Sequence, residues 1–527
     1  MFTHLEGSTP MGMGCMFLAS VGAFLFGFDN GWWGTILGSP KFLSDYGSCV
    51  DVDGVSTCNL STQQLSVGTA VQSGGIMIGC LIAIYLNDLI GRKLSLVTTG
   101  AISIVGVLIE ATSATGGSGR FSQFVVGKVI ASIAMGLAVN IVPIYLSETS
   151  TASARGFAVS IYQNIQILGL ILAAGIVYAS AKSTTSSAYL IPICLQIIAP
   201  TIMVLASPIL PESPRWLMWK GRRNDAIAAA TKLFATPTNN FDASKCVDEI
   251  QLAIDAERQS KDASRWADLM HGPDLRRLLI AVGIQSLQQA QGSSYMNSYI
   301  VSFLQSTGVT DVFPVIMGLY ALYYVAVLSG HVLPDTVGRR PILMWTSAFC
   351  GCCLLVVSAL VVGFKTPSDA TSKSSIALIF LWYISFGIQS PLIWITTAES
   401  APTRNREKVQ AIACFFGFGV SLLITSVSPY IQNVGYGNLG GRIGFIWSAF
   451  AFVTLVWVFF TVPEMKGFSI EQLDFLYNNK VATRKFKGYR FDTEAGIVVD
   501  SDTDDVIVQK KDAGAVETVK SIDEQGT

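Results

Sequence analysis

Long apolar segments constrain the fold of this chain more than any other feature. A helix needs about 20 mostly apolar residues to cross the hydrocarbon core of a bilayer, and twelve segments reach that length. Gly and Pro within them are compatible with membrane helices, because neighbouring helices satisfy the backbone groups that such residues free. We therefore predict an all-α integral membrane protein with twelve transmembrane helices. The predicted spans are 12–37, 64–86, 94–113, 121–142, 157–180, 188–209, 277–304, 313–333, 341–363, 375–397, 409–430 and 443–462.

The composition excludes several other classes of protein. Of the 527 residues, 51% are hydrophobic and 13% are charged, and the mean hydropathy is +0.49, far more apolar than a soluble globular chain. The net charge of −1 provides no overall field that attracts nucleic acid. Seven of the ten cysteines lie in apolar spans, where cysteine acts as a small hydrophobe, and no histidine has metal-like neighbours. We expect no metal, no cofactor, no nucleotide-driven step and no enzymatic activity.

Basic residues indicate which side of the membrane the loops face. Twelve spans place both termini on the same side, and Lys and Arg favour the short cytoplasmic loops. The short loops on the side of the termini carry eight basic residues, against six on the opposite side. Both termini are therefore predicted to be cytoplasmic. The eight residues are Arg92, Lys93, Arg155, Arg339, Arg340, Arg404, Arg406 and Lys408.

The first outer loop carries two features that agree with this topology. Asn59-Leu60-Ser61 is a glycosylation sequon, although a single sequon also occurs by chance. Cys49 and Cys58 lie in the same loop and can form a disulfide in oxidising surroundings, or can equally stay free.

The span pattern divides the chain into five regions. Two six-helix halves are separated by a polar insert, in which the pattern of residues 218–265 indicates short amphipathic helices at the membrane interface. The tail after Asp474 is polar and charge-mixed, which is typical of disorder. The regions are a cytoplasmic N-terminus (1–11), an N-terminal half (12–210), a cytoplasmic central loop (211–276), a C-terminal half (277–463) and a largely disordered cytoplasmic tail (464–527).

The two halves contain the same motifs at an interval of about 250 residues. Each pair occupies the same place in its half, and the three pairs occur in the same order. The halves are therefore predicted to be structural repeats. The pairs are Asp88-x-x-Gly91-Arg92-Lys93 with Asp335-x-x-Gly338-Arg339-Arg340, Glu148 and Arg155 with Glu399 and Arg406, and Pro211-Glu212 with Pro463-Glu464.

From about Met11 to Asp474 the chain resembles the sugar porter family of the major facilitator superfamily, and fungal members in particular. The resemblance implies two six-helix halves around a site at the membrane midplane, and location in the plasma membrane. The matching strings are GFDNG (27–31), DLIGRK (88–93), PIYLSE (143–148) with Arg155-Gly156, PESPRWL (211–217), QQ (288–289), DTVGRR (335–340), Glu399 with Arg404 and Arg406, and PEMKGFSIEQLD (463–474).

The charged residues of the repeated motifs lie at helix ends on the cytoplasmic side. We expect them to pair across the seam between the halves when this face is closed and to separate when it opens. When the face is closed the pairs are partly desolvated, so removing one partner leaves the other charge without compensation. The alternative is a static role in topology and folding. This predicted gate network comprises Asp88, Arg92, Glu148, Arg155, Glu212, Asp335, Arg339, Arg340, Glu399, Arg404 and Arg406.

Two ionisable residues within spans are candidates for proton coupling, since such groups are costly in a membrane. In proton-coupled members of the family an Asp in span 1 and an Arg in span 4 form the coupling pair. Here the positions hold Asp29 and Lys128, which keep the charges but not the bidentate guanidinium. The resemblance favours proton symport. A structural ion pair in a facilitative uniporter is the alternative.

The resemblance also implies a sugar site of amides and an aromatic platform. Three positions depart from the family pattern: Ser294 replaces an Asn, Ser298 replaces the first aromatic of a Tyr-Tyr pair, and Gly417 replaces an amide. Amides at 285, 291 and 297 are candidates for compensation, and helix–helix contact is the alternative role for all of these groups. The predicted substrate-binding residues are Gln163, Gln288, Gln289, Ser294, Tyr299 and Trp394.

Together these features predict a secondary transporter that acts as a monomer and carries a monosaccharide or polyol with one proton. A uniporter, or the same fold carrying an oligosaccharide, a cyclic acid or a secondary metabolite, is the first alternative. A sugar sensor that does not transport is the second. The expected partners are the sugar, H+ and the lipid bilayer.

Overall fold

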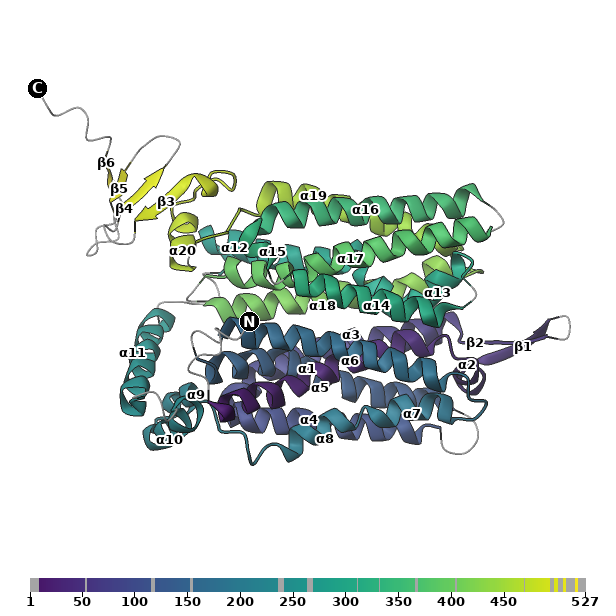
Figure 1. The fold of residues 1–527 in the computed structure, drawn as a ribbon, viewed down its shortest axis with the longest axis horizontal. Coiled ribbons are helices and arrows are strands. Elements are labelled where there is room, and N and C mark those ends of the chain that lie inside the picture. The colour runs from purple at the N-terminus through teal and green to yellow at the C-terminus, as the bar shows by residue number, and fades with distance from the viewer. Residues whose placement is uncertain are drawn as a thin grey trace, which may run out of the picture.

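Two groups of helices lie side by side along the length of the molecule (Figure 1). The computed structural model describes the whole chain except residues 1–8, 53–54, 115–118, 152–154, 236–240, 263–268, 310, 331, 365–367, 403–404, 469, 493–496, 501–505, 509–516 and 520–527. Within the described part, eleven helices are long and apolar enough to cross a membrane.

The first group of helices is the N-terminal half. Its fourth long helix contains Pro143, and its last span is divided into two shorter helices. The helices are α1 (Pro10–Ile36), α3 (Thr62–Ile90), α4 (Arg92–Thr112), α5 (Phe121–Thr149), α6 (Arg155–Ser180), and α7 (Ser187–Leu195) followed by α8 (Ile198–Leu205).

The second group is the C-terminal half. Its first predicted span, 277–304, is divided by a π-helix and is not among these eleven helices. Gly292 within this π-helix has φ 109°, a conformation that residues with a Cβ rarely adopt. The elements are α12 (Gly272–Gln288), the π-helix η3 (Gln289–Ser293), α13 (Ser294–Ser306), α14 (Val312–Ser329), α15 (Leu333–Thr336), α16 (Arg339–Gly363), α17 (Asp369–Ser400), α18 (Arg406–Gln432), η5 (Gly440–Ile443) and α19 (Gly444–Thr461).

The remaining elements lie at the two ends of the bundle (Figure 1). An antiparallel hairpin marks one end, here called the hairpin end, and the helices between the halves mark the other, the insert end. Beyond the second half, α20 and a four-stranded sheet also lie at the insert end. The elements are α2 (Pro40–Tyr46), β1 (Ser48–Val52), β2 (Val55–Asn59), α9 (Pro214–Trp219), α10 (Arg223–Phe234), α11 (Ala243–Asp262), α20 (Ile470–Asn478), η6 (Phe486–Gly488), β3 (Tyr489–Asp492), β4 (Ile497–Asp500), β5 (Val506–Val508) and β6 (Glu517–Val519).

The halves meet along α3 with α18, α6 with α14, and α1 with α13. Near the hairpin end, the Ser66 hydroxyl donates to the Ser426 carbonyl at 2.6 Å. At Gly34 of α1 the approach is so close that a Cβ would lie 2.4 Å from the carbonyl oxygen of Asn297. Contacts between the halves are therefore tight toward the hairpin end.

The prediction of a disordered tail is wrong for the segment that immediately follows Asp474. Leu476, Tyr477 and Phe486 are buried in a cluster with residues of α12, α16, α17 and α19. Arg277 at the start of α12 donates to the carbonyl oxygens of Ser400 and Ala401 and pairs with Asp474. The polar composition of the tail did not indicate this packing, because a few apolar side chains at helical spacing suffice to attach a short helix to an existing surface.

Candidate functional site

A cavity of about 150 Å³ lies between the halves. Side chains from α1, α3 and α6 line one side, and side chains from α12 to α14, α17 and α18 line the other. Amides, hydroxyls and aromatic rings predominate in the lining, the mixture that a molecule with several hydroxyls and an apolar face requires.

The structure brings five of the six predicted substrate-binding residues into this lining. Gln163 comes from the first half, and Gln288, Gln289, Ser294 and Trp394 come from the second. The Ser294 hydroxyl donates to Gln289 Oε1 at 2.6 Å, so these two side chains are positioned as a unit.

The sixth residue, Tyr299, is placed elsewhere. Its ring is 1% exposed, and its hydroxyl donates to the Thr425 carbonyl at 2.6 Å, away from the cavity. Gln285 and Gln291 are also turned away: the Gln285 amide donates to a threonine hydroxyl of α17, and the Gln291 amide donates to a glutamine of the same helix. Of the candidate compensating amides, only Asn297 lines the cavity.

Sequence reasoning missed three amides of the lining. Asn30 and Gln72 are joined by a hydrogen bond of 3.1 Å from the Gln72 amide to Asn30 Oδ1. Gln166 follows Gln163 on the same face of α6. The sequence does contain a signal for these residues. Polar amides within apolar spans are costly when they face lipid, which favours an inward position, and residues three apart on a helix share a face, which relates Gln166 to Gln163.

Asp29 and Lys128 are both buried in the interior of the first half, but they form no ion pair in the described structure. Trp32 Nε1 donates to Asp29 Oδ1 at 2.8 Å. Lys128 Nζ instead lies over the rings of Trp32 and Trp33, at 5.1 and 4.2 Å from the ring centroids. The cation is thus held by aromatic faces, with the carboxylate nearby but not in contact.

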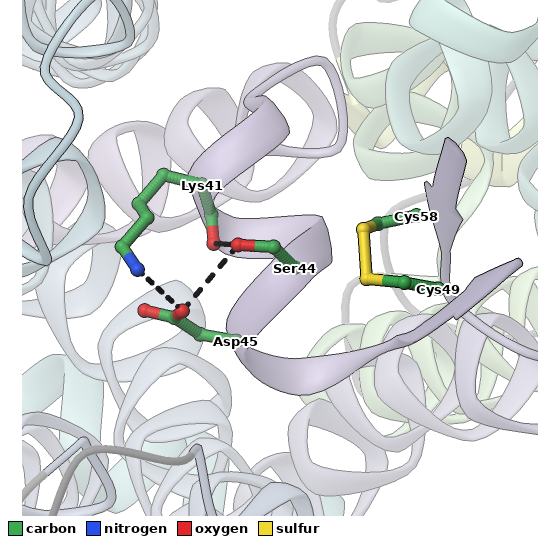
Figure 2. Close-up of a disulfide and its surroundings, with 5 residues drawn as sticks. All are labelled: Lys41, Ser44, Asp45, Cys49 and Cys58. Carbon is green, nitrogen blue, oxygen red and sulfur yellow. Dashed lines mark hydrogen bonds and ion pairs between the residues drawn. A yellow bond between two sulfur atoms is a disulfide. The ribbon is translucent and has the colours of Figure 1, made fainter. Parts of the chain in front are cut away.

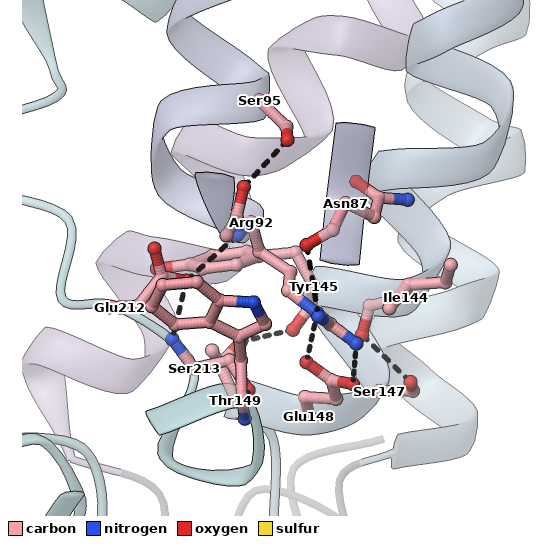
Figure 3. Close-up of polar contacts among 12 residues, drawn as sticks. Asn87, Arg92, Ser95, Ile144, Tyr145, Ser147, Glu148, Thr149, Glu212 and Ser213 are labelled. Atoms are coloured by element: carbon pink, nitrogen blue, oxygen red, sulfur yellow. Dashed lines mark hydrogen bonds and ion pairs between the residues drawn. The ribbon is translucent and has the colours of Figure 1, made fainter. Parts of the chain in front are cut away.

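At the insert end of the first half, Arg92 connects three segments (Figure 3). Its guanidinium makes two hydrogen bonds to the Glu148 carboxylate, of 2.9 and 3.0 Å. The Glu212 carboxylate accepts from the backbone N–H groups of Arg92 and Lys93, the first residues of α4. Burial raises the pKa of Glu212, and backbone hydrogen bonds from Ser213, Lys93 and Arg92 partly offset that rise.

The second half repeats this arrangement. Arg339 makes two hydrogen bonds to Glu399, of 3.2 and 3.0 Å. Glu464 accepts from the backbone N–H groups of Arg339 and Arg340 at the start of α16. Each capped helix follows a glycine with positive φ, Gly91 or Gly338, at which a Cβ would lie 2.4 or 2.6 Å from the capping carboxylate. The glycines of the repeated motif therefore make room for the acid.

These pairs form within each half. Asp88 and Asp335 add weaker contacts to the arginine of their own half, at 3.9 and 3.1 Å, and are largely exposed. Arg340 donates to the Phe459 carbonyl instead of an acid. Arg404 and the side chain of Arg155 lie outside the described residues, and Arg406 is described at the start of α18.

The hairpin end carries the predicted disulfide and sequon. Cys49 and Cys58 are opposite each other in the β1–β2 ladder and are joined by a disulfide (Figure 2). Asn59 is exposed at the end of β2. Ser61 of the sequon caps α3, since its hydroxyl accepts from the Gln64 N–H.

Comparisons with known proteins agree with this architecture. The xylose transporter XylE from E. coli, in an inward open conformation, is similar with a TM-score of 0.72 at 20% sequence identity, over 88% of this chain and 99% of that one. This likeness confirms the predicted all-α membrane fold with two helical halves.

The sequence comparisons then identify the family. A family profile described as "Sugar (and other) transporter" matches residues 15–477, so the chain belongs to this family of the major facilitator superfamily. The major facilitator-type transporter ecdD of Aspergillus rugulosus is 30% identical, over 86% of this chain and 85% of its own length. The high glucose sensor RGT2 of Saccharomyces cerevisiae is 29% identical over 89% of this chain, which spans 61% of that protein. The predicted family is confirmed, and it is a family of transporters and not of enzymes.

Proposed function

We propose that this chain carries a monosaccharide, such as a hexose, a pentose or a related polyol, across the plasma membrane by alternating access together with a proton. The insert end, where α1 begins and α20 lies, faces the cytoplasm. The protein acts as a monomer, since both sides of the cavity come from one chain.

The observation that carries this proposal is the cavity between the halves. Gln163 on one half and Gln288 and Gln289 on the other present amide donors and acceptors to the same space, and Trp394 adds an aromatic face. A ligand held by both halves is exposed to one side or the other when the halves rock against each other. The gate pairs of each half then lie at the mouth on the insert end.

Proton coupling is supported by the buried charges beside this cavity. Asp29 precedes the cavity residue Asn30 in α1, so a change in its protonation acts directly on a helix that lines the site. Buried ionisable groups in a membrane are retained at a high energetic cost, which favours a functional role.

Two related proteins guide the choice of substrate. XylE is named a xylose transporter and RGT2 a glucose sensor, so D-xylose and D-glucose are the first compounds to test. A sensor that binds glucose without carrying it is the second candidate, favoured by the similarity to RGT2.

Uptake of labelled D-glucose and D-xylose by yeast cells that lack their own carriers tests the proposal. We expect accumulation at acidic pH that an uncoupler abolishes, and loss of uptake in Trp394→Ala. Trp345→Ala is the matched control, because Trp345 is 77% exposed on the outer surface of α16. Uptake that only equilibrates indicates a uniporter, whereas binding without uptake by protein that has reached the membrane supports the sensor.

A further inference from the structure

A third ionisable side chain is buried in the same region as Asp29 and Lys128. Glu110, near the end of α4, is completely buried, and neither of its carboxylate oxygens has a hydrogen-bond partner in the described structure. The charged and polar groups that act on it are Asp29, Lys128 and the amide of Gln196. An acid without a partner in this position is costly unless it has a function.

Close contact between α4 and α5 places Glu110 beside Lys128. A Cβ on Gly127 of α5 would lie 2.6 Å from the backbone nitrogen of Glu110 and 2.7 Å from the carbonyl oxygen of Gly106. Only glycine permits this approach of the two backbones. Since Lys128 directly follows Gly127, the approach brings the acid of α4 to the level of the cation of α5.

The buried groups have unequal numbers of positive and negative charges. Among the described residues, Lys128 Nζ has no hydrogen-bond partner, and its contacts with Trp32 and Trp33 leave its charge unchanged. Asp29 Oδ2 also has no hydrogen-bond partner within this part of the chain. With all three groups ionised the cluster of Asp29, Glu110 and Lys128 has a charge of −1, and with one proton bound to either carboxylate it is neutral. Burial strongly favours the neutral form.

Among the described residues, the charged groups that act on Glu110 are Asp29 and Lys128. Tyr46 of α2 reaches the Glu110 backbone only through Ser113, and burial raises the pKa of Tyr46 to about 12, which keeps it neutral. Asp45 is already paired with Lys41 at 2.7 Å. Asp29 and Lys128 are therefore the charges that face Glu110.

We infer that Asp29 and Glu110 share one proton around Lys128, so that Glu110 is a second proton-binding residue of the coupling site. As a role in coupling, this inference rests on the proposed function. The proton comes from the aqueous phase, adds to one carboxylate, and changes the charge of the cluster from −1 to zero. The Gln196 amide lies beside Asp29: with its nitrogen facing the carboxylate, it donates to Asp29 Oδ1 at 3.2 Å. A cavity of about 10 Å³ lined by Asp29 and Gln196 is large enough for one water molecule, through which a proton can pass.

Infrared spectroscopy of the purified full chain tests the shared proton without any sugar. We expect a carbonyl stretching band of a protonated, buried carboxyl that shifts in D2O and disappears at alkaline pH. Glu110→Gln and Asp29→Asn each remove the band, because each leaves one carboxylate opposite one cation. Lys128→Met enlarges it about twofold, since two carboxylates then each need a proton.

Two further variants control for folding and for other acids. Glu110→Asp keeps a carboxyl and should keep the band, while Asp311→Asn, at an exposed position before α14, should leave the spectrum unchanged. A band that is absent from the wild type, or that persists unchanged in Glu110→Gln, overturns the inference.

Transport then separates this inference from the proposed function. If the wild type accumulates labelled D-glucose or D-xylose at acidic pH, Glu110→Gln should lower the ratio of acidic to neutral uptake to about one. A normal ratio in that variant refutes the role in coupling while symport itself stands. If the wild type moves neither sugar, the proposed function fails, and the infrared result still decides whether the cluster holds a proton.

Discussion

Substitution of Glu212 by alanine should destabilise the first half measurably, because this carboxylate caps α4 from a distant part of the chain. It accepts from the backbone N–H groups of Arg92 at 2.9 Å, Lys93 at 3.2 Å and Ser213 at 2.9 Å. Gly91, the residue before α4, provides no side-chain cap of its own. In Glu212→Ala the first turn of α4 therefore loses its acceptor.

The expected loss follows from these contacts. Removal of a helix cap costs about 0.5–2 kcal/mol, and a negative charge at a helix N-terminus contributes about 0.3–1 kcal/mol more. With the additional hydrogen bond from Ser213, we expect a loss of about 3 kcal/mol. For a unit the size of one half, this corresponds to a decrease of about 8 °C in the midpoint of thermal denaturation. Glu212→Gln keeps a carbonyl acceptor without the charge and should lose about half as much.

Thermal denaturation in detergent, followed by size-exclusion chromatography of the fluorescently tagged chain, measures these shifts. Glu464→Ala should behave like Glu212→Ala, since Glu464 caps α16 in the same way. Asp225→Ala is the control: Asp225 pairs with Arg222 and both side chains are more than half exposed, so the pair contributes little. A shift below about 2 °C for Glu212→Ala, or equal shifts for alanine and glutamine, would refute the capping argument.

Three further predictions address other parts of the molecule. Gly27→Ala should cost about 3 kcal/mol or more and leave little monodisperse protein on chromatography, because its Cβ would lie 1.7 Å from the Gln166 carbonyl oxygen. Arg277→Ala should cost about 3–5 kcal/mol in thermal denaturation, since it removes a buried guanidinium that pairs with Asp474 and donates to two backbone carbonyls, whereas Arg277→Lys should cost less. Peptide mass spectrometry without reductant should find Cys49 and Cys58 linked, and a maleimide reagent should label Cys58 only in Cys49→Ser.

The number of spans and the location of the charged motifs could be predicted from the sequence because both depend on local properties. A membrane helix satisfies its own backbone, so its length and apolar character are visible in one continuous segment. The repeated motifs stand at the ends of such segments, which predicts that Arg92 and Glu148 lie at the same end of the bundle. Gln163, Gln288 and Trp394 were predicted on family resemblance and do line the cavity.

Tertiary structure decided which partner each side chain meets. Glu212 is 120 residues from Arg92, and nothing in either segment indicates that the acid binds a backbone nitrogen rather than the guanidinium. Tyr299 follows a π-helix that changes the helical phase, so its spacing from Gln289 no longer predicts the face on which it lies. The sequence shows Glu110 as an acid within an apolar span. Its position beside Lys128, however, depends on Gly106 and Gly127, which let α4 and α5 approach closely. The length and polarity of each helix follow from its own sequence, whereas pairing between helices depends on how their surfaces pack.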